Sequence, residues 1–319
     1  MKRSSKVRVF APATVANVSC GFDIFGFAVD FPGDEAIVAL NNDLRGVKIT
    51  SIEGDDGRLP KDPQKNTAGV AAGALLEYLK EEVGVSIALK KRMPFGSGLG
   101  SSAASAAASV LGVNFLLGEP LSRKELLPFA IEAERAACGM AHADNVAPSL
   151  MGGFILIRSY HPLDVFNLPV PENLSCVVVH PDMVIPTKKS RDVLQSKVDM
   201  KDVVSQCGNV SALTLGLLQS DFRLIKSSLH DAIVEPQRAG LIRGFYEVKS
   251  AALKEGALGC GISGSGPSVF ALTDSMVLAE KIGVSMKRTW KEMGIFSKLY
   301  CSKINIGGAK IIENQNQNE

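Results

Sequence analysis

Residues 94–104 have the types and spacing needed to bind a phosphate group. They read Pro-Phe-Gly-Ser-Gly-Leu-Gly-Ser-Ser-Ala-Ala, with glycines at positions 96, 98 and 100. Glycine has no Cβ, so it permits positive φ angles and lets a ligand approach the main chain closely. The alanine-rich run after Ser102 favours a helix, and serine is a favoured residue at a helix start. A glycine-rich turn that leads into a helix N-terminus presents free N–H groups and partial positive charge, which suit phosphate.

This stretch follows neither of the two best-known glycine-rich phosphate motifs. No Gly-Lys-Ser/Thr follows the glycines, and Gly100 is followed by Ser-Ser-Ala, which breaks G-x-G-x-x-G. A flexible Gly/Ser loop that caps a packed alanine helix is the structural alternative. The form Gly-Leu-Gly-Ser-Ser-Ala resembles the nucleotide-binding motif of the kinase superfamily named after galactokinase, homoserine kinase, mevalonate kinase and phosphomevalonate kinase. That resemblance implies a loop that wraps the ATP phosphates and a serine at the helix start that assists Mg²⁺.

Composition argues against several classes of protein, including nucleic-acid-binding, membrane and disulfide-rich secreted proteins. The chain has 319 residues and a formal net charge of +2, so it gives no reason to expect a nucleic-acid partner or an anionic membrane. The basic start lacks a secretory apolar region, and no apolar run is long enough to cross a bilayer. The six cysteines are scattered without C-x-x-C pairing, which favours reduced thiols over disulfides or zinc ligands. We expect a cytoplasmic protein.

Residues 12–23 carry several polar side chains in an otherwise apolar segment that contains turns. Asn17 and Asp23 could be ordinary turn residues. The string Pro-Ala-Thr-x-Ala-Asn-x-x-x-Gly-Phe-Asp resembles the first motif of the homoserine kinases within the superfamily. The resemblance implies that Asn17 and Asp23 contact an amino-acid substrate.

A second cluster lies at residues 134–148. Glu134 could simply be solvated or paired with a neighbouring arginine, and a single histidine such as His142 is more often structural than catalytic. Glu134 followed by His-x-Asp-Asn-Val-Ala-Pro, from His142 on, resembles the second cluster of homoserine kinases. It implies that Glu134 binds Mg²⁺ together with Ser102, while His142 and Asn145 line the homoserine pocket. Mg²⁺ prefers such oxygen ligands.

Two further segments complete the resemblance. The basic run at 188–191 is by itself typical of an exposed charged face, but the resemblance places Thr187 near the transferred phosphate. It assigns Arg191 and Arg238 to the substrate carboxylate, which a guanidinium can bind through two hydrogen bonds. The glycine-rich turn at 259–268 could be any tight hairpin. It resembles the third superfamily motif, which packs against the phosphate loop.

The residue assignments implied by the resemblance fall into three sets. The ATP-binding residues are Asn66, Pro94, Phe95, Gly96, Ser97, Gly98, Leu99, Gly100, Ser101, Ser102, Ala103 and Ala104. The catalytic residues are Asn145, Thr187, Ser102 and Glu134, of which Ser102 and Glu134 bind the metal. The substrate-binding residues are Asn17, Asp23, His142, Asn145, Arg191 and Arg238.

Alternating strand and helix patterns predict a mixed α/β architecture. The resemblance implies an α+β two-domain small-molecule kinase fold. Its N-terminal α/β domain would cover residues 1–160 and contain a left-handed β-α-β unit, although right-handed crossovers are the strong default. A C-terminal ferredoxin-like domain would cover 161–312, with ATP and homoserine between the two. Residues 313–319 form a polar tail whose composition predicts disorder.

The resemblance extends over nearly the whole chain and implies transfer of the ATP γ-phosphate to the hydroxyl of L-homoserine, with Mg²⁺, in threonine biosynthesis. The family also suggests a homodimer. One alternative is another small-molecule kinase, such as a mevalonate or shikimate kinase; mevalonate kinases place an aspartate base where this chain has Asn145. A catalytically inactive relative that only binds ligands is the other alternative. Because an amide cannot accept a proton at neutral pH, we expect catalysis without a dedicated base, with His142 as the alternative base.

Overall fold

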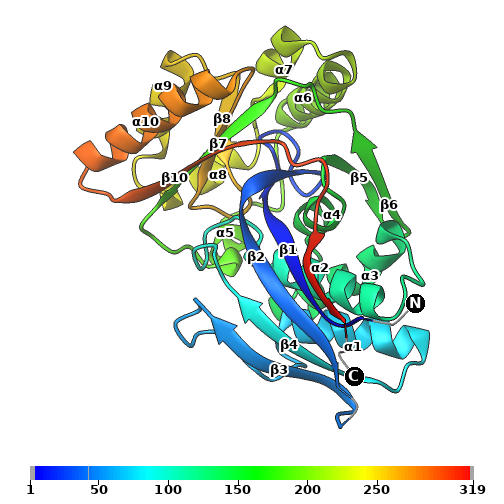
Figure 1. Cartoon of the computed structure of the whole chain (residues 1–319). Helices are drawn as coiled ribbons and strands as arrows, with labels where there is room; N and C mark the ends of the chain where they lie inside the picture. The colour runs from blue at the N-terminus through cyan, green and yellow to red at the C-terminus, as the bar shows by residue number, and fades with distance from the viewer. Residues whose placement is uncertain (1–3, 42, 317–319) are drawn as a thin grey trace.

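The computed structural model describes residues 4–41 and 43–316, and within them the strands form two sheets. The larger sheet has the strand order β11-β1-β2-β4-β3, and β5 pairs with β2 and β6 (Figure 1). Its strands are β1 (Ser4–Ala16), β2 (Phe25–Asn41), β3 (Gly46–Glu53), β4 (Gly84–Lys90), β5 (Phe154–Tyr160), β6 (Leu163–Leu168) and β11 (Lys310–Asn316). Strands β3 and β4 are parallel neighbours joined through a helix, as a β-α-β unit requires. The left-handedness of that crossover stays a prediction.

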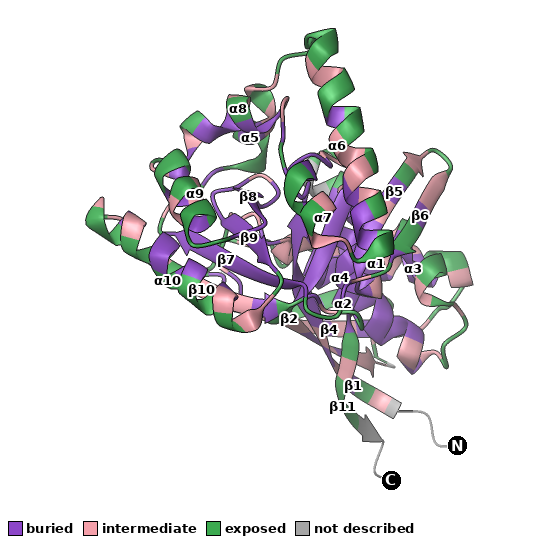
Figure 2. Ribbon diagram, turned by 90° about the horizontal axis from the view of Figure 1, so that it is seen from above, coloured by how far each residue is buried: buried purple, intermediate pink, exposed green. Residues whose placement is uncertain are grey.

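Three helices pack against this sheet, and a fourth packs on those three. The three are α1 (Thr67–Leu79), α2 (Ser101–Leu116) and α4 (Ala143–Met151), and the fourth is α3 (Arg123–Cys138). Helix α2 is buried on nearly every side (Figure 2), which its alanine, serine and glycine residues allow because their side chains are small. A Cβ on Gly112 would lie 2.6 Å from Val38 in β2, so α2 approaches the sheet closely. The helix that begins at the glycine loop is thus held rigidly in the core.

The smaller sheet has the order β10-β7-β9-β8. Its strands are β7 (Ser175–Pro181), β8 (Gly259–Ile262), β9 (Val269–Thr273) and β10 (Ser297–Lys303). Numbered along the chain this is the order 4-1-3-2, all antiparallel, with helices before β8 and between β9 and β10. That is the ferredoxin-like arrangement expected for this half. Its helices are α5 (Thr187–Asp192), α6 (Met200–Gln219), α7 (Phe222–Ser228), α8 (Glu235–Arg238), α9 (Phe245–Lys254) and α10 (Met276–Glu292).

The sheets divide the chain differently from the expected boundaries in two places. Strand β6 lies beyond residue 160 but pairs with β5 in the larger sheet. Strand β11 returns to the same sheet and pairs with β1 along its length. The expectation of disorder was therefore wrong for residues 313–316, because main-chain hydrogen bonds to the edge of β1 need no apolar side chains. Residues 317–319 lie outside the described part of the chain.

The expected chemistry of the cysteines is confirmed where the structure describes them. Cys20, Cys176, Cys207, Cys260 and Cys301 are all free thiols, and three of these five are buried. Over residues 4–41 and 43–316, no helix combines the length and apolar character needed to cross a membrane.

Candidate active site

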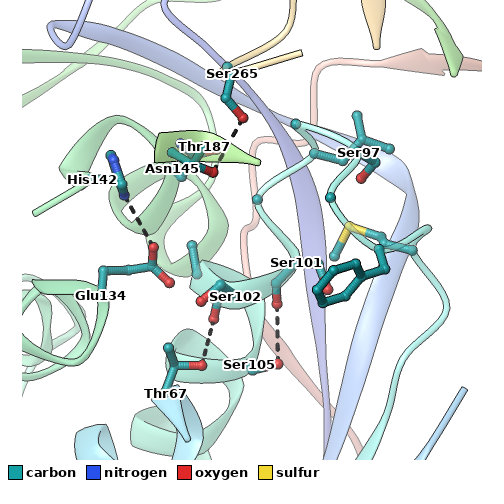
Figure 3. A pocket seen from close by; sticks show the side chains of 18 of the residues that line it. Thr67, Ser97, Ser101, Ser102, Ser105, Glu134, His142, Asn145, Thr187 and Ser265 are labelled. Atoms are coloured by element: carbon teal, nitrogen blue, oxygen red, sulfur yellow. Dashed lines mark hydrogen bonds and ion pairs between the residues drawn. The ribbon is translucent and has the colours of Figure 1, made fainter. Parts of the chain in front are cut away.

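A cavity of about 520 Å³ is lined by residues from both halves of the chain (Figure 3). Every residue that the sequence assigned to the site lines it, except Ala104. The assigned residues that line the cavity are Asn17, Asp23, Asn66, residues 94–103, Glu134, His142, Asn145, Thr187, Arg191 and Arg238. Ala104 is instead fully buried in the first turn of α2, where its N–H donates to the carbonyl of Gly100.

The glycine loop requires its glycines for two separate reasons. Gly96, Gly98 and Gly100 have φ angles of 61°, 73° and 70°, in the left-handed region. A Cβ on Gly98 would also lie 2.3 Å from the backbone oxygen of Ser263. Conversely, the Ser263 hydroxyl donates to the carbonyl of Gly98 at 2.8 Å. The turn at 259–268 therefore packs against the glycine loop, as the sequence suggested.

The two serines at the start of α2 have different surroundings. The Ser101 hydroxyl donates to Asp34 at 2.6 Å, and the Lys91 ammonium lies 2.5 Å from the same carboxylate oxygen. Lys91 also donates to the Ser101 carbonyl at 2.8 Å. Ser102 lines the cavity, and no residue of the described chain accepts or donates a hydrogen bond at its hydroxyl. Ser102 is thus the serine left available to a ligand.

Glu134 has one carboxylate oxygen that no described residue satisfies. The residue is 4% exposed; its Oε2 lies 3.3 Å from Nδ1 of His142, while its buried Oε1 has no partner within the described chain. An unpaired buried carboxylate oxygen is costly unless a donor or cation meets it. With the Ser102 hydroxyl, it forms an oxygen donor set of the kind that Mg²⁺ binds through one or two protein groups.

The charge of His142 is set by competing effects. Burial disfavours its charged form. The hydrogen bond to Glu134 and the negative charges of Asp144 and Glu134 outweigh burial, so the pKa of His142 lies above its ordinary value.

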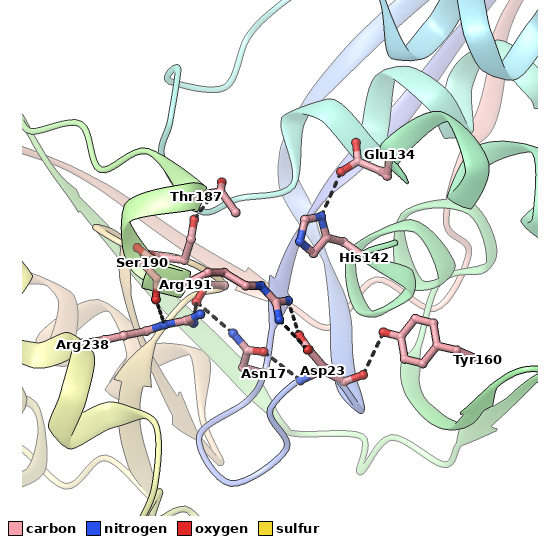
Figure 4. A network of polar contacts seen from close by, with 11 residues as sticks. Asn17, Asp23, Glu134, His142, Tyr160, Thr187, Ser190, Arg191 and Arg238 are labelled. Atoms are coloured by element: carbon pink, nitrogen blue, oxygen red, sulfur yellow. Dashed lines mark hydrogen bonds and ion pairs between the residues drawn. The ribbon is translucent and has the colours of Figure 1, made fainter. Parts of the chain in front are cut away.

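At the other end of the cavity, two arginines lie close to one aromatic ring. Arg191 pairs with Asp23 through two hydrogen bonds of 2.7 and 2.9 Å (Figure 4). Arg238 donates to the carbonyls of Ser190 and Gly264 at 2.8 and 3.1 Å. Their guanidinium carbons lie 5.1 and 5.0 Å from the centre of the Phe22 ring. Burial and the charge of Arg191 lower the pKa of Arg238 to about 10, which still leaves it charged at neutral pH.

Three other assigned residues make specific hydrogen bonds. Asn17, at a φ of 71°, donates to the Gly264 carbonyl at 2.8 Å and accepts from the Asp23 N–H at 3.0 Å. Asn145 accepts from the Thr14 hydroxyl at 2.8 Å. Asn66 caps α1, where its side chain accepts from the Ala68 N–H. Asn66 therefore has a structural role whether or not it also contacts nucleotide.

Comparison with known proteins agrees with this geometry. The chain matches the family described as GHMP kinases N terminal domain over residues 66–153 and GHMP kinases C terminal over residues 213–292. The homoserine kinase of Chlorobium phaeobacteroides (strain BS1) is 48% identical over 95% of this chain and 98% of its own length. This chain belongs to the homoserine kinases of the GHMP kinase family.

Solved structures support the same placement. The crystal structure of homoserine kinase from Cytophaga hutchinsonii shares 56% identity with a TM-score of 0.95, covering 97% of this chain and 98% of that one. The structure of L. major mevalonate kinase, at 17% identity, has a TM-score of 0.72 over 95% of this chain and 99% of its own, and shares the fold alone. The expected two-domain kinase fold and its use of ATP and Mg²⁺ are therefore confirmed at the level of the homoserine kinase family.

Asp144 lines the cavity but was not assigned from the sequence, although it stands between His142 and Asn145. Asp144 is 2% exposed and has an Oδ1 with no partner in the described structure. Burial and the negative charge of Asp23 raise the pKa of Asp144 to about 7, against the opposing charges of His142 and Arg191. The only sequence signal was its place in the second homoserine kinase motif, where an Asp-Asn pair is easily taken for turn chemistry.

Asp34 and Lys91 were also missed, for a different reason. They lie 57 positions apart in the sequence and meet only because β2 and β4 are neighbours in the sheet. Nothing in the local sequence around either residue signals this buried pair beneath the glycine loop.

Proposed function

We propose that this chain transfers the γ-phosphoryl group of ATP to the hydroxyl of L-homoserine, giving O-phospho-L-homoserine for threonine biosynthesis. One observation carries the proposal: a single cavity joins a glycine loop at a helix N-terminus to the Asp23, Arg191 and Arg238 charges at its other end. The first part suits the phosphates of a nucleotide. The second suits the carboxylate and ammonium of a small amino acid.

At the nucleotide end, residues 94–103 are assigned to ATP and its phosphates. Ser102 and Glu134 would hold Mg²⁺, consistent with the free Ser102 hydroxyl and the unpaired Glu134 oxygen. When bound, the metal neutralises negative charge on the phosphate oxygens during transfer. Thr187, at the start of α5, is assigned to the transferred phosphate; its hydroxyl lies 3.5 Å from that of Ser265.

At the substrate end, binding of an amino acid would replace the Arg191–Asp23 ion pair by ion pairs with the substrate's own carboxylate and ammonium. Arg191 and Asp23 neutralise each other in this structure. A zwitterionic amino acid placed between them would give its carboxylate to Arg191 and Arg238 and its ammonium to Asp23. Asn17 and His142 line the same space and complete its polar surface. In the bound state, Asp23, Arg191 and Arg238 would then each face an opposite charge.

The transfer step itself is proposed to proceed without a dedicated protein base. Asn145 orients the homoserine hydroxyl, and the proton leaves late, to an oxygen of the γ-phosphate. Asp23 is occupied by the substrate ammonium, which keeps it ionised. The pKa of His142 lies above its ordinary value, so at neutral pH a larger fraction of this imidazole already carries a proton and cannot accept another.

An ADP-release assay across homoserine, mevalonate, shikimate and threonine tests the function. We expect Mg²⁺-dependent turnover with homoserine to exceed that with each of the other three by at least about a hundredfold. Mevalonate and shikimate lack the ammonium and so lose a charge-assisted contact, while threonine keeps both charges but misplaces its hydroxyl. Equal turnover of mevalonate or shikimate would contradict the assignment. Release of ADP without a phosphorylated acceptor would instead indicate a nucleotide hydrolase.

A homodimer in the cytoplasm is the corresponding proposal for assembly and location, and it rests on the family resemblance. Light scattering coupled to gel filtration measures the mass directly. A mass equal to one chain of 33.9 kDa at micromolar concentration would contradict the dimer.

A further inference from the structure

Thr14 connects the two parts of the site that must meet during transfer. Its side chain is fully buried in β1, and its hydroxyl donates to Oδ1 of Asn145 in α4 at 2.8 Å. Its backbone N–H donates to the carbonyl of Leu99 in the glycine loop at 3.0 Å. We propose that Thr14 is a positioning residue, which fixes the Asn145 amide relative to the phosphate loop. This inference rests on the proposed function, because it concerns how the acceptor hydroxyl is oriented.

The hydrogen bond between Thr14 and Asn145 lies in a tightly packed part of the structure. A Cβ on Gly100 would lie 2.2 Å from Oγ1 of Thr14 and 2.8 Å from Oδ1 of Asn145. Gly100 is also the residue that caps the start of α2, at a φ of 70°. Strand β1, the glycine loop and α4 therefore meet at one point, and the absence of a side chain at Gly100 makes room for the bond. Threonine is β-branched, so its χ1 is restricted and its hydroxyl direction is fixed by the strand.

The direction of this bond decides which end of the Asn145 amide serves the ligand. The amide carries one oxygen, which accepts, and one NH₂ group, which only donates. Thr14 occupies the oxygen, so the NH₂ group of Asn145 is the end left for a ligand in the cavity. The acceptor oxygen of the alcohol would then receive a hydrogen bond from Asn145, and the hydrogen of that alcohol would point away from it. The hydrogen is thereby left free to reach a phosphate oxygen.

Without the Thr14 hydroxyl, Asn145 would no longer be held with its NH₂ group toward the ligand. The terminal torsion of asparagine is broad and roughly two-fold, so the amide could present either end to the alcohol. With the oxygen inward, Asn145 would accept the alcohol hydrogen and keep it from the phosphate oxygen that is proposed to take it. The effect should therefore fall on kcat, since ATP and the carboxylate and ammonium of the substrate are held by other residues.

Paired substitutions separate positioning from simple packing. Thr14→Val keeps the shape and removes the hydroxyl, while Thr14→Ser keeps the hydroxyl and removes a methyl group. We expect Thr14→Val to lower kcat roughly tenfold, as for one lost hydrogen bond with an oriented group, with the KM for ATP unchanged. Thr14→Ser should stay within about threefold of the parent chain. Thr273→Val is the matched control, because Thr273 is also a fully buried strand threonine, whose hydroxyl has no partner among described residues.

A double-mutant cycle with Asn145→Ala decides whether Thr14 acts through the amide. If it does, Thr14→Val costs nothing further in the Asn145→Ala background. An equal loss of kcat in both backgrounds would overturn the proposal, as would a Thr14→Ser variant no better than Thr14→Val. If Thr14→Val does not fold, Thr14→Ala compared with Thr14→Ser makes the same test. Turnover of homoserine by the parent chain tests the proposed function separately; if it accepts another alcohol, the same ratios are measured with that alcohol.

Discussion

Replacing Asp144 by asparagine tests how much the ionisation of this buried carboxyl group destabilises the folded chain. Burial, together with the charge of Asp23, raises the pKa of Asp144 from the ordinary 3.8 to about 7 in the folded chain. The unfolded chain loses this proton near pH 3.8, while the folded chain keeps it until about pH 7. The folded state therefore loses stability as pH rises between these values. From pH 5 to pH 7 the loss amounts to roughly 2–3 kcal/mol, at about 1.4 kcal/mol per pH unit.

An asparagine at this position cannot ionise, so its contribution to the free energy of unfolding does not change with pH. A buried amide without a partner carries its own penalty of about 1–3 kcal/mol, which is the same at every pH. The difference in free energy of unfolding between Asp144→Asn and the parent chain isolates the ionisation. We expect that difference to shift in favour of the variant by roughly 2–3 kcal/mol between pH 5 and pH 8.

Urea unfolding of the ligand-free chain at pH 5, 6, 7 and 8 measures this difference. Asp274→Asn is the matched control, because it removes an exposed aspartate from the same chain. The groups that act on Asp144, namely Asp23, His142 and Arg191, are unchanged in both variants. A difference that stays constant from pH 5 to pH 8 would refute the reasoning, because it would mean that the carboxyl group ionises alike in both states.

Four other substitutions give distinct outcomes. Arg238→Leu removes one of the two proposed carboxylate partners, a contact worth about 1.5–3 kcal/mol, so the KM for homoserine should rise roughly ten- to a hundredfold while that for ATP changes little; equal effects on both would refute this placement. Glu134→Gln should abolish most Mg²⁺-dependent turnover with little change in Tm, because the lost charge was buried with one oxygen unpaired; full activity at the parent's Mg²⁺ requirement would exclude the role. Gly98→Val should lower the yield of folded protein as well as ATP binding, since its Cβ would meet the Ser263 backbone at 2.3 Å. Gly96→Ala, whose Cβ would meet only the movable side chain of Val184, should fold and be the milder variant, and equal thermal unfolding of the two would contradict this reading.

Gly98 has a second role that the local sequence does not reveal. If the loop only bound phosphate, a valine at Gly98 would weaken ATP binding and leave the chain folded. The structure shows that the loop also supports the 259–268 turn, with the Ser263 hydroxyl bonded to the Gly98 carbonyl. A side chain at Gly98 therefore disturbs the contact between two motifs that are far apart in the sequence.

What could be predicted from sequence depended on local signals. The glycine loop and the serine that starts α2 could be predicted because turn and helix-start preferences act over a few residues. The site residues were assigned through the family resemblance, since nothing local indicates that Asp23 and Arg191, 168 positions apart, form an ion pair. Handedness of the β-α-β crossover likewise came only from resemblance.

The strands that the sequence did not predict were missed for physical reasons. Residues 25–34 of β2 were not predicted as a strand, because Gly26, Pro32 and Gly33 are residues that usually disfavour one. A Cβ on Gly26 would lie 1.8 Å from the Asp144 carbonyl oxygen, so this glycine marks a close approach to α4. Strand β11 was missed because its polar sequence gave no reason to expect a partner strand.

The charges at the substrate end also bear on which alcohol the site accepts. Arg191 already has Asp23 as a partner, whereas Arg238 donates to backbone carbonyls and has no ion pair within the described chain. A carboxylate that binds to Arg238 alone leaves the Asp23–Arg191 pair intact and gains one arginine. A carboxylate that binds to both arginines in place of Asp23 leaves Asp23 without its partner, so that Asp23 then needs a cation. Homoserine brings that cation as its ammonium, but mevalonate and shikimate do not. Either they forgo the second arginine or they leave Asp23 unpaired, and each choice forfeits a charge-assisted contact of about 1.5–3 kcal/mol. Discrimination between amino-acid and hydroxy-acid substrates then follows from the exchange of partners, without any residue that clashes with the wrong substrate.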